Sequence, residues 1–128
     1  MAKKNFIVFL SAFAIDQLSK YFIPTNFIIK NSGLPFGINM QEFFSLITVC
    51  ILLFVFIALY VRFYRRINFG FVLIISGAAS NLVDRIFLGY VRDFIDVGIA
   101  TVNLADIFIW IGIVIVILRT KSEGSLRI

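Results

Sequence analysis

The sequence predicts an all-α membrane protein built as a bundle of four transmembrane helices. Apolar residues make up 61% of the 128 residues and charged residues 15%, whereas a soluble domain is nearer half apolar and a quarter charged. Four apolar stretches approach the length of about 20 residues that a membrane-spanning helix needs. These stretches account for most of the chain, so we expect a single integral membrane domain over residues 1–128.

The first predicted span covers residues 5–23. Lys3 and Lys4 precede its apolar core, as in a signal peptide, but no A-x-A cleavage site follows it. Asp16 and Lys20 lie in its last two turns, at a spacing of i, i+4 that allows them to pair. We therefore expect this helix to be retained in the protein, with the buried pair orienting it.

The other three spans differ in where they carry charge. Residues 43–61 contain no charged side chain. Residues 67–88 carry Asp84 near their end, and residues 102–118 carry Asp106 near their start. The short connection between the second and third spans is basic, whereas the connections on the other side are longer.

The basic residues predict the orientation of the bundle. Eight of the twelve fall on one side of the predicted membrane, and an excess of Lys and Arg marks cytoplasmic loops. We therefore expect both termini in the cytoplasm. The formal net charge of +5 is then a consequence of topology, and a nucleic-acid partner is not expected because no basic stripe is interleaved with aromatics. The eight residues are Lys3, Lys4, Arg62, Arg65, Arg66, Arg119, Lys121 and Arg127.

With this topology, the polar residues gather at the outer face. A charged side chain at the bilayer centre costs roughly 2.5–3.5 kcal/mol, so a cluster of such residues needs a role. For Asp84 and Arg85, a network that ties helices together is the favoured interpretation. The cluster comprises Asp16, Lys20, Asn31, Gly33, Asn81, Asp84, Arg85, Asp93, Asp96, Asn103 and Asp106.

Asp93 and Asp106 differ from the other acids because they outnumber the basic partners available on that side. Two carboxylates in one wet pocket can share a proton, each raising the pKa of the other. Such a pair can activate water as an acid and a base. The chain has no His and a single Cys, Cys50, which excludes histidine catalysis, histidine metal ligation and a disulfide scaffold.

The residues alone leave other functions open. A proton- or ion-coupled transporter or channel subunit fits intramembrane carboxylates equally well, although a pathway also needs polar residues in the inner half of the bilayer. A non-catalytic assembly protein is a third interpretation. It would tolerate Asp→Asn changes.

Five motifs in order resemble those of the lipoprotein signal peptidase (signal peptidase II) family. The pattern D-Q-x-x-K is matched at residues 16–20, N-x-G-x-x-F at 31–36 and G-x-x-x-N-x-x-D-R at 77–85. V-x-D-F is matched at residues 91–94 and N-x-A-D at 103–106. The chain departs from the family pattern at Leu34-Pro35, where two small residues are usual. It is also shorter in the outer connections, where the family carries a small β-structure and a loop.

The resemblance implies an aspartic endopeptidase that cuts a diacylglyceryl-modified prolipoprotein just before the lipidated Cys. It implies a monomer in the bacterial inner membrane, in contact with lipid, with its active site toward the outer face and no metal or cofactor. The implied catalytic residues are Asp93 and Asp106. The implied substrate-binding residues are Asn31, Gly33, Asn81, Arg85 and Asn103, and structural polar support is implied for Asp16, Gln17, Lys20 and Asp84.

Overall fold

Four helices make up most of the chain in the computed structural model, which describes residues 2–31, 42–63 and 67–125. The predicted set of four helices is present in this part of the chain. Gly33 and the Leu34-Pro35 departure lie outside the described residues. The helices are α1 (Ala2–Phe22), α2 (Glu42–Phe63), α3 (Phe69–Leu88) and α4 (Leu104–Ser125).

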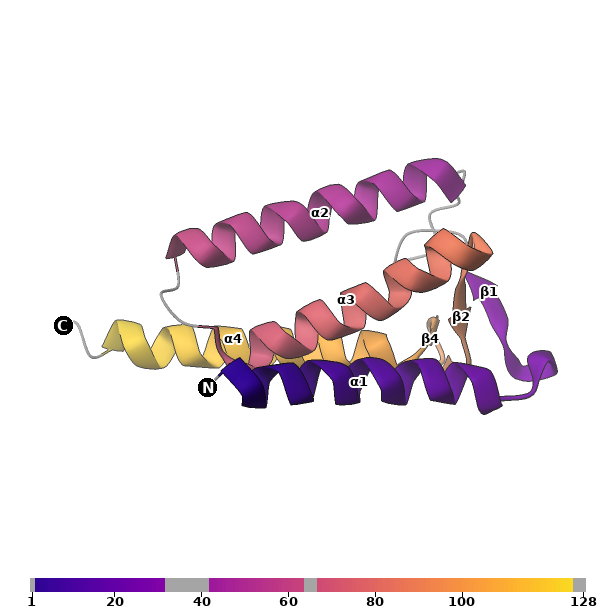
Figure 1. Cartoon of the computed structure of the whole chain (residues 1–128), viewed down its shortest axis with the longest axis horizontal. Coiled ribbons are helices and arrows are strands. Elements are labelled where there is room, and N and C mark those ends of the chain that lie inside the picture. The colour runs from indigo at the N-terminus through magenta and orange to yellow at the C-terminus, as the bar shows by residue number, and fades with distance from the viewer. Residues whose placement is uncertain (1, 32–41, 64–66, 126–128) are drawn as a thin grey trace.

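The helices run side by side along the long axis of the molecule (Figure 1). Helix α3 packs against both α1 and α4, and α2 lies on the outer side of α3. Both termini lie at one end of the bundle, and the strands lie at the opposite end. The acids of the predicted site are carried by or near the strands, so the architecture separates the site from the termini.

Small residues bring α3 and α4 into close contact. A Cβ added to Gly70 would lie 2.6 Å from the carbonyl oxygen of Gly112, and a Cβ added to Gly77 would press against the carbonyl oxygen of Ala105. Ala105 is completely buried. Small residues allow helix backbones to approach closely, as in helix pairs within membranes. The start of α4 is therefore fixed against the middle of α3.

The C-terminal part of α2 contacts the start of α3. The rings of Tyr60 and Phe71 stack with their centroids 4.0 Å apart, and the Tyr60 hydroxyl accepts a 3.2 Å hydrogen bond from the backbone N–H of Asn68. Asn68 also caps α3, because its side chain accepts a 2.8 Å bond from the N–H of Phe71. Asn is a favoured N-cap. The third predicted span began at residue 67, and this cap places the start of the helix at Phe69.

Two short antiparallel ribbons close the end of the bundle that carries the site. Strand β1 pairs with β2 so that Lys30 faces Arg92 and Ile29 faces Asp93. Because side chains alternate along a strand, Lys30 and Arg92 project from one face of this ribbon and Asp93 from the other. The small outer β-structure implied by the resemblance is present. The elements are η1 (Thr25–Phe27), β1 (Ile29–Asn31), β2 (Val91–Asp93), β3 (Ile95–Asp96) and β4 (Thr101–Val102).

The second ribbon corrects the predicted fourth span. That span was expected to begin at residue 102, but Thr101–Val102 pair with Ile95–Asp96, and α4 begins at Leu104. Asp96 was expected in the polar cluster. It lies instead at the exposed end of β3, where its carboxylate accepts a 2.7 Å bond from the N–H of Gly98. Gly98 has a φ of 84°, which suits a glycine in a tight turn.

The distribution of polar and apolar side chains is the reverse of that in a soluble protein, with apolar side chains on the surface and polar ones in the interior. Large apolar side chains face outward on the helices, with Phe54 72% and Phe87 78% exposed. Among the described residues, the largest fully buried side chains are all polar: Lys20, Asn103, Asp16, Asp84, Asp93, Ser76 and Ser80. By length and composition, Phe69–Leu88 qualifies as a membrane span in this part of the chain, and Ile47–Arg62 is a shorter apolar segment.

Candidate functional site

The side chain and backbone of Asn103 connect two carboxylates from different elements. Its Nδ2 donates a 2.6 Å hydrogen bond to Oδ1 of Asp93 on β2. Its backbone N–H donates a 3.1 Å bond to Oδ2 of Asp106 in the first turn of α4. The two acids singled out in the sequence therefore meet at one place in the fold.

Local sequence explains why α4 begins at this point. The Asn103 Oδ1 accepts a 3.0 Å bond from the N–H of Asp106, while the Asp106 carboxylate accepts one from the N–H of Asn103. This reciprocal arrangement is a capping box, which satisfies otherwise unpaired N–H groups at a helix start. The Asn103 side chain therefore caps α4. The same two residues thus begin the helix and place a carboxylate in the site.

Asparagine side chains from two further elements complete the contacts of the acids. On α3, Asn81 donates a 2.8 Å bond from Nδ2 to Asp106, and its Oδ1 accepts bonds from Asn103 and from Nζ of Lys20. On β1, Asn31 donates a 2.8 Å bond from Nδ2 to Oδ2 of Asp93. Three asparagines therefore hold the two carboxylates, and each reaches them from a different element.

Burial changes the acidity of Asp93, which is 1% exposed. Loss of hydration raises its pKa to about 6, and the negative charge of Asp106 acts in the same direction. The hydrogen bonds from Asn31 and Asn103 oppose the rise because they favour the ionised form. A carboxyl group with this pKa gains and loses its proton close to neutral pH, as an acid–base catalyst must.

A buried ion-pair network lies beside the two acids. Lys20 Nζ is 2.7 Å from Oδ2 of Asp16, the predicted i, i+4 pair, and 3.2 Å from Oδ2 of Asp84. Asp16 also accepts a 2.7 Å bond from the hydroxyl of Ser80. The cation is therefore compensated by two carboxylates, as buried charges must be if they are not to destabilise the fold.

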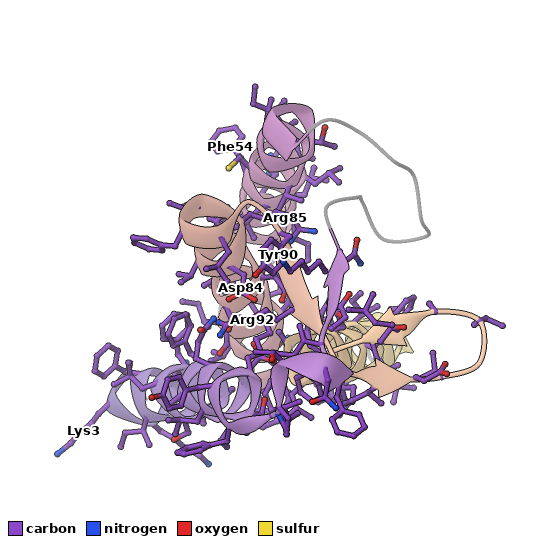
Figure 2. The ribbon with its side chains drawn as sticks, turned by 90° about the vertical axis from the view of Figure 1, so that its right-hand side faces the viewer. Lys3, Phe54, Asp84, Arg85, Tyr90 and Arg92 are labelled. Atoms are coloured by element: carbon purple, nitrogen blue, oxygen red, sulfur yellow. The ribbon has the colours of Figure 1, made fainter. Side chains whose placement is uncertain are left out.

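Asp84 extends this network to the strand that carries Asp93. It forms a second ion pair with Arg92 on β2, at 2.7 Å, and accepts a 3.1 Å bond from the side chain of Gln17. Asp84 and Arg92 lie next to each other in Figure 2, between α1 and the strands. The expected role of Asp84 in a network between elements matches this geometry. Sequence reasoning missed Arg92 and Ser80. The signal that could have found Arg92 is that a buried Asp84 needs a charged partner outside α3.

Arg85 lies on the same turn of α3 as Asn81. Its Nη1 donates a 3.4 Å bond to the carbonyl oxygen of Asn81, and its guanidinium is close enough to interact electrostatically with both Asp106 and Asp93. Of the predicted substrate-binding residues, Asn31, Asn81 and Asn103 contact the acids directly. Arg85 lies beside them.

The three asparagines contact the two acids directly, and Asn81 also contacts Lys20, so the site suits acid–base chemistry. Within the described part of the chain, no three His, Cys, Asp or Glu side chains come together in a way that could hold a metal ion. A pocket of about 370 Å³ lies beside the ribbon and is lined in part by Lys30, Tyr90 and Arg92, but not by Asp93 or Asp106.

Comparisons with known proteins agree with the motifs. Residues 8–121 match the model of the family described as signal peptidase (SPase) II. The chain is 34% identical to the lipoprotein signal peptidase of Caldicellulosiruptor bescii, over 93% of this chain and 91% of that protein. It is 32% identical to the lipoprotein signal peptidase of Wigglesworthia glossinidia brevipalpis, over 94% of this chain and 96% of that protein.

Two solved structures share the fold. Both are described as a bacterial membrane enzyme structure by the in meso method. The first has a TM-score of 0.78 at 20% identity and covers 98% of this chain and 92% of its own. The second has a TM-score of 0.71 at 19% identity and covers 92% of each. The family match spans most of the sequence and confirms the resemblance carried by the five motifs. The chain therefore belongs to the signal peptidase II family.

Proposed function

We propose that this protein is an intramembrane aspartic endopeptidase that removes the signal peptide from diacylglyceryl-modified prolipoproteins. The cut falls just before the lipidated Cys. The observation that carries the proposal is the bridge from Asn103 to both Asp93 and Asp106. Membership of the signal peptidase II family supports a peptidase acting on prolipoproteins.

In this mechanism Asp93 and Asp106 act as one acid–base unit. The ionised carboxylate takes a proton from a water molecule, whose oxygen attacks the scissile carbonyl carbon. The protonated carboxyl donates a hydrogen bond to the carbonyl oxygen. When the C–N bond breaks, the pair delivers a proton to the leaving amine. The two groups titrate as a pair, so the starting proton belongs to the dyad rather than to either residue.

All four helices span the bacterial inner membrane in this proposal, with both termini in the cytoplasm and the strands at the outer face. Two features support it: the outward apolar side chains such as Phe54 and Phe87, and the position of both termini at the end opposite the strands (Figure 1). Among the described residues, Phe69–Leu88 alone meets a plain hydropathy and length criterion for a span, and α1 carries the polar residues Asp16, Gln17 and Lys20.

In this proposal the enzyme is a monomer that binds one prolipoprotein. The acyl chains of the substrate lie between the helices, in contact with membrane lipid. Arg85 is the residue best placed to contact the polar region around the scissile bond, because its guanidinium lies near both acids. Asn31 contacts Asp93 from β1, and Gly33 is proposed to bind the substrate together with Asn31. Asn81 and Asn103 contribute by holding the acids, and no metal or cofactor takes part.

The test is to change each acid separately, as Asp93→Asn and Asp106→Asn, and to incubate the purified proteins with a diacylglyceryl-modified precursor. Each change should abolish formation of a shortened product with an N-terminal lipidated Cys. Asp96→Asn is the matched control, because Asp96 is an exposed carboxylate on the neighbouring ribbon, and it should cut at the wild-type rate. Full activity of either dyad variant would overturn the proposal.

The same variants separate the peptidase from a proton- or ion-coupled membrane protein. Reconstituted vesicles would show a proton flux that Asp106→Asn abolishes if the chain formed a pathway. The peptidase proposal expects no such flux and full dependence of precursor cleavage on both acids.

A further inference from the structure

We propose that Arg92 is a positioning residue for Asp93. Its guanidinium fastens β2 to α1 and α3, and thereby fixes the neighbouring carboxylate in the dyad. This inference rests on the proposed function, because it takes Asp93 as a catalytic residue.

The two side chains point to opposite sides of the same strand. Arg92 and Asp93 are adjacent in β2, and successive side chains of a strand project to opposite faces. Asp93 reaches Asn103 and Asn31 on one face, while Arg92 reaches Asp84 and Gln17 on the other. The contacts of Arg92 therefore also restrict the position of the adjacent Asp93.

The contact between Arg92 and Asp84 uses several donors at once. Nη2 lies 2.7 Å from Oδ1 and Nε lies 3.2 Å from Oδ2 of Asp84, and the backbone N–H of Arg92 donates a further 3.1 Å bond to Oδ2. Nη2 also donates a 2.8 Å bond to Oε1 of Gln17. A planar guanidinium that engages both carboxylate oxygens fixes orientation as well as distance, which an ammonium group does not.

The Asp84 carboxylate that Arg92 contacts is itself held in place by other side chains. Asp84 is 1% exposed and is held by Lys20 at 3.2 Å and by Nε2 of Gln17 at 3.1 Å. Gln17 donates from the same Nε2 to the hydroxyl of Ser80 at 2.9 Å. Arg92 therefore connects β2 to side chains that already join α1 to α3 (Figure 2).

The strand needs such an attachment because its own pairing is short. Strand β2 has three residues and pairs with the three residues of β1. A two-stranded ribbon is only marginally stable by itself. Catalytic geometry is demanding, since a displacement of about 1 Å can lower a rate about 100-fold. The ladder to β1 alone is a weak constraint for a residue with that requirement.

The experiment compares Arg92→Met and Arg92→Lys with Lys30→Met. Lys30 is the matched control because it is the cross-strand neighbour of Arg92 on the same face of the ribbon and its ammonium lies over the ring of Tyr90. We expect Arg92→Met to lower kcat about 10- to 100-fold on the diacylglyceryl precursor, with KM changed by less than about two-fold. Lys30→Met should leave kcat at the wild-type value.

Two further readouts separate positioning from general destabilisation. The midpoints of the pH profile of kcat should shift in Arg92→Met, because the surroundings of Asp93 change. Arg92→Lys should stay below the wild-type rate by about 10-fold, since it keeps the charge but loses the planar fork. If Arg92→Met does not fold, Arg92→Lys and Gln17→Met, which removes the acceptor for Nη2, carry the test.

The proposal falls if Arg92→Met keeps the wild-type kcat and pH profile, or if its activity loss equals its loss of folded protein. That result would leave the peptidase assignment intact as long as Asp93→Asn and Asp106→Asn are inactive. Activity in those two variants would overturn the peptidase assignment whatever Arg92 does.

Discussion

The carboxylate of Asp16 on α1 accepts a 2.8 Å hydrogen bond from the backbone N–H of Ala105 on α4, although 89 residues separate the two. The first N–H groups of a helix lack partners within the helix, and a negative charge is favoured beside them. Ala105 directly precedes Asp106. The contact therefore connects the end of the first helix to the turn that carries one of the two acids.

Replacing Asp16 by Asn should destabilise the protein. Asp16 is completely buried and forms one of the two ion pairs of Lys20. Removing one partner of a buried pair costs roughly 3 kcal/mol, so the midpoint of thermal unfolding in detergent should fall clearly. Asp96→Asn, at an exposed carboxylate, should leave that midpoint unchanged. Equal midpoints for the two variants would show that the buried pair contributes little.

The glycines of α3 offer two matched substitutions at one helix interface. Gly70→Ala places a Cβ against the carbonyl oxygen of Gly112, and Gly77→Ala places one against that of Ala105. Overpacking of this kind costs about 1–3 kcal/mol, so both variants should lose stability. Only Gly77→Ala should also lose most of its peptidase activity, because Ala105 lies next to Asp106. A similar loss of activity in both variants, measured on equal amounts of folded protein, would argue against this local effect.

Asn103 has two separable roles, and two substitutions separate them. Ser is a good N-cap, so Asn103→Ser should preserve the start of α4 while removing the amide that donates to Asp93. We expect a small change in unfolding temperature and a large loss of activity. Asn103→Ala should lose the cap as well, at a further cost of about 1 kcal/mol. Wild-type activity in Asn103→Ser would show that the bridge to Asp93 is dispensable.

The acidity of Asp93 predicts how stability depends on pH. Its pKa in the folded protein is about 6, above the ordinary value of 3.8. A raised pKa means that folding favours the protonated form, so its contribution is fully present below about pH 4 and is lost as pH rises through about 6. Wild type should therefore lose about 2–3 kcal/mol relative to Asp93→Asn between pH 4 and pH 7.5, at 1.36 kcal/mol per unit of pKa shift. Unfolding free energies of wild type and Asp93→Asn, measured between pH 4 and pH 7.5, check this prediction. A difference between the two proteins that does not change with pH would contradict it.

The helices were predictable because long apolar runs carry a strong local signal. The runs around residues 43–61 and 67–88 correspond closely to α2 and α3. The proximity of Asp93 and Asp106, which both bond to Asn103, was expected because these acids outnumber the basic residues predicted on the same side of the bundle. The caps formed by Asn68 and Asn103 determine where α3 and α4 begin.

The rest depends on tertiary contacts that leave little trace in sequence. Asp96 and Asp93 are only three residues apart, yet Asp96 is exposed at the end of β3 and Asp93 is buried in β2, because the two residues belong to different ribbons. Arg92 pairs with Asp84 across the turn after α3, a contact that helical spacing does not predict. Such a pairing depends on how β2 packs against α3 in the folded protein.

The alternation of Arg92 and Asp93 on β2 has a consequence for the evolution of the chain length. Inserting or deleting one residue between Gly89 and Asp93 would turn every following side chain of the strand to the opposite face. A guanidinium would then face Asn103, and a carboxylate would face Asp84. The turn at Gly98 carries no such constraint, because it lies beyond both acids' contacts on an exposed ribbon. Homologues should therefore vary in length at that turn and keep a fixed spacing from the end of α3 to Asp93.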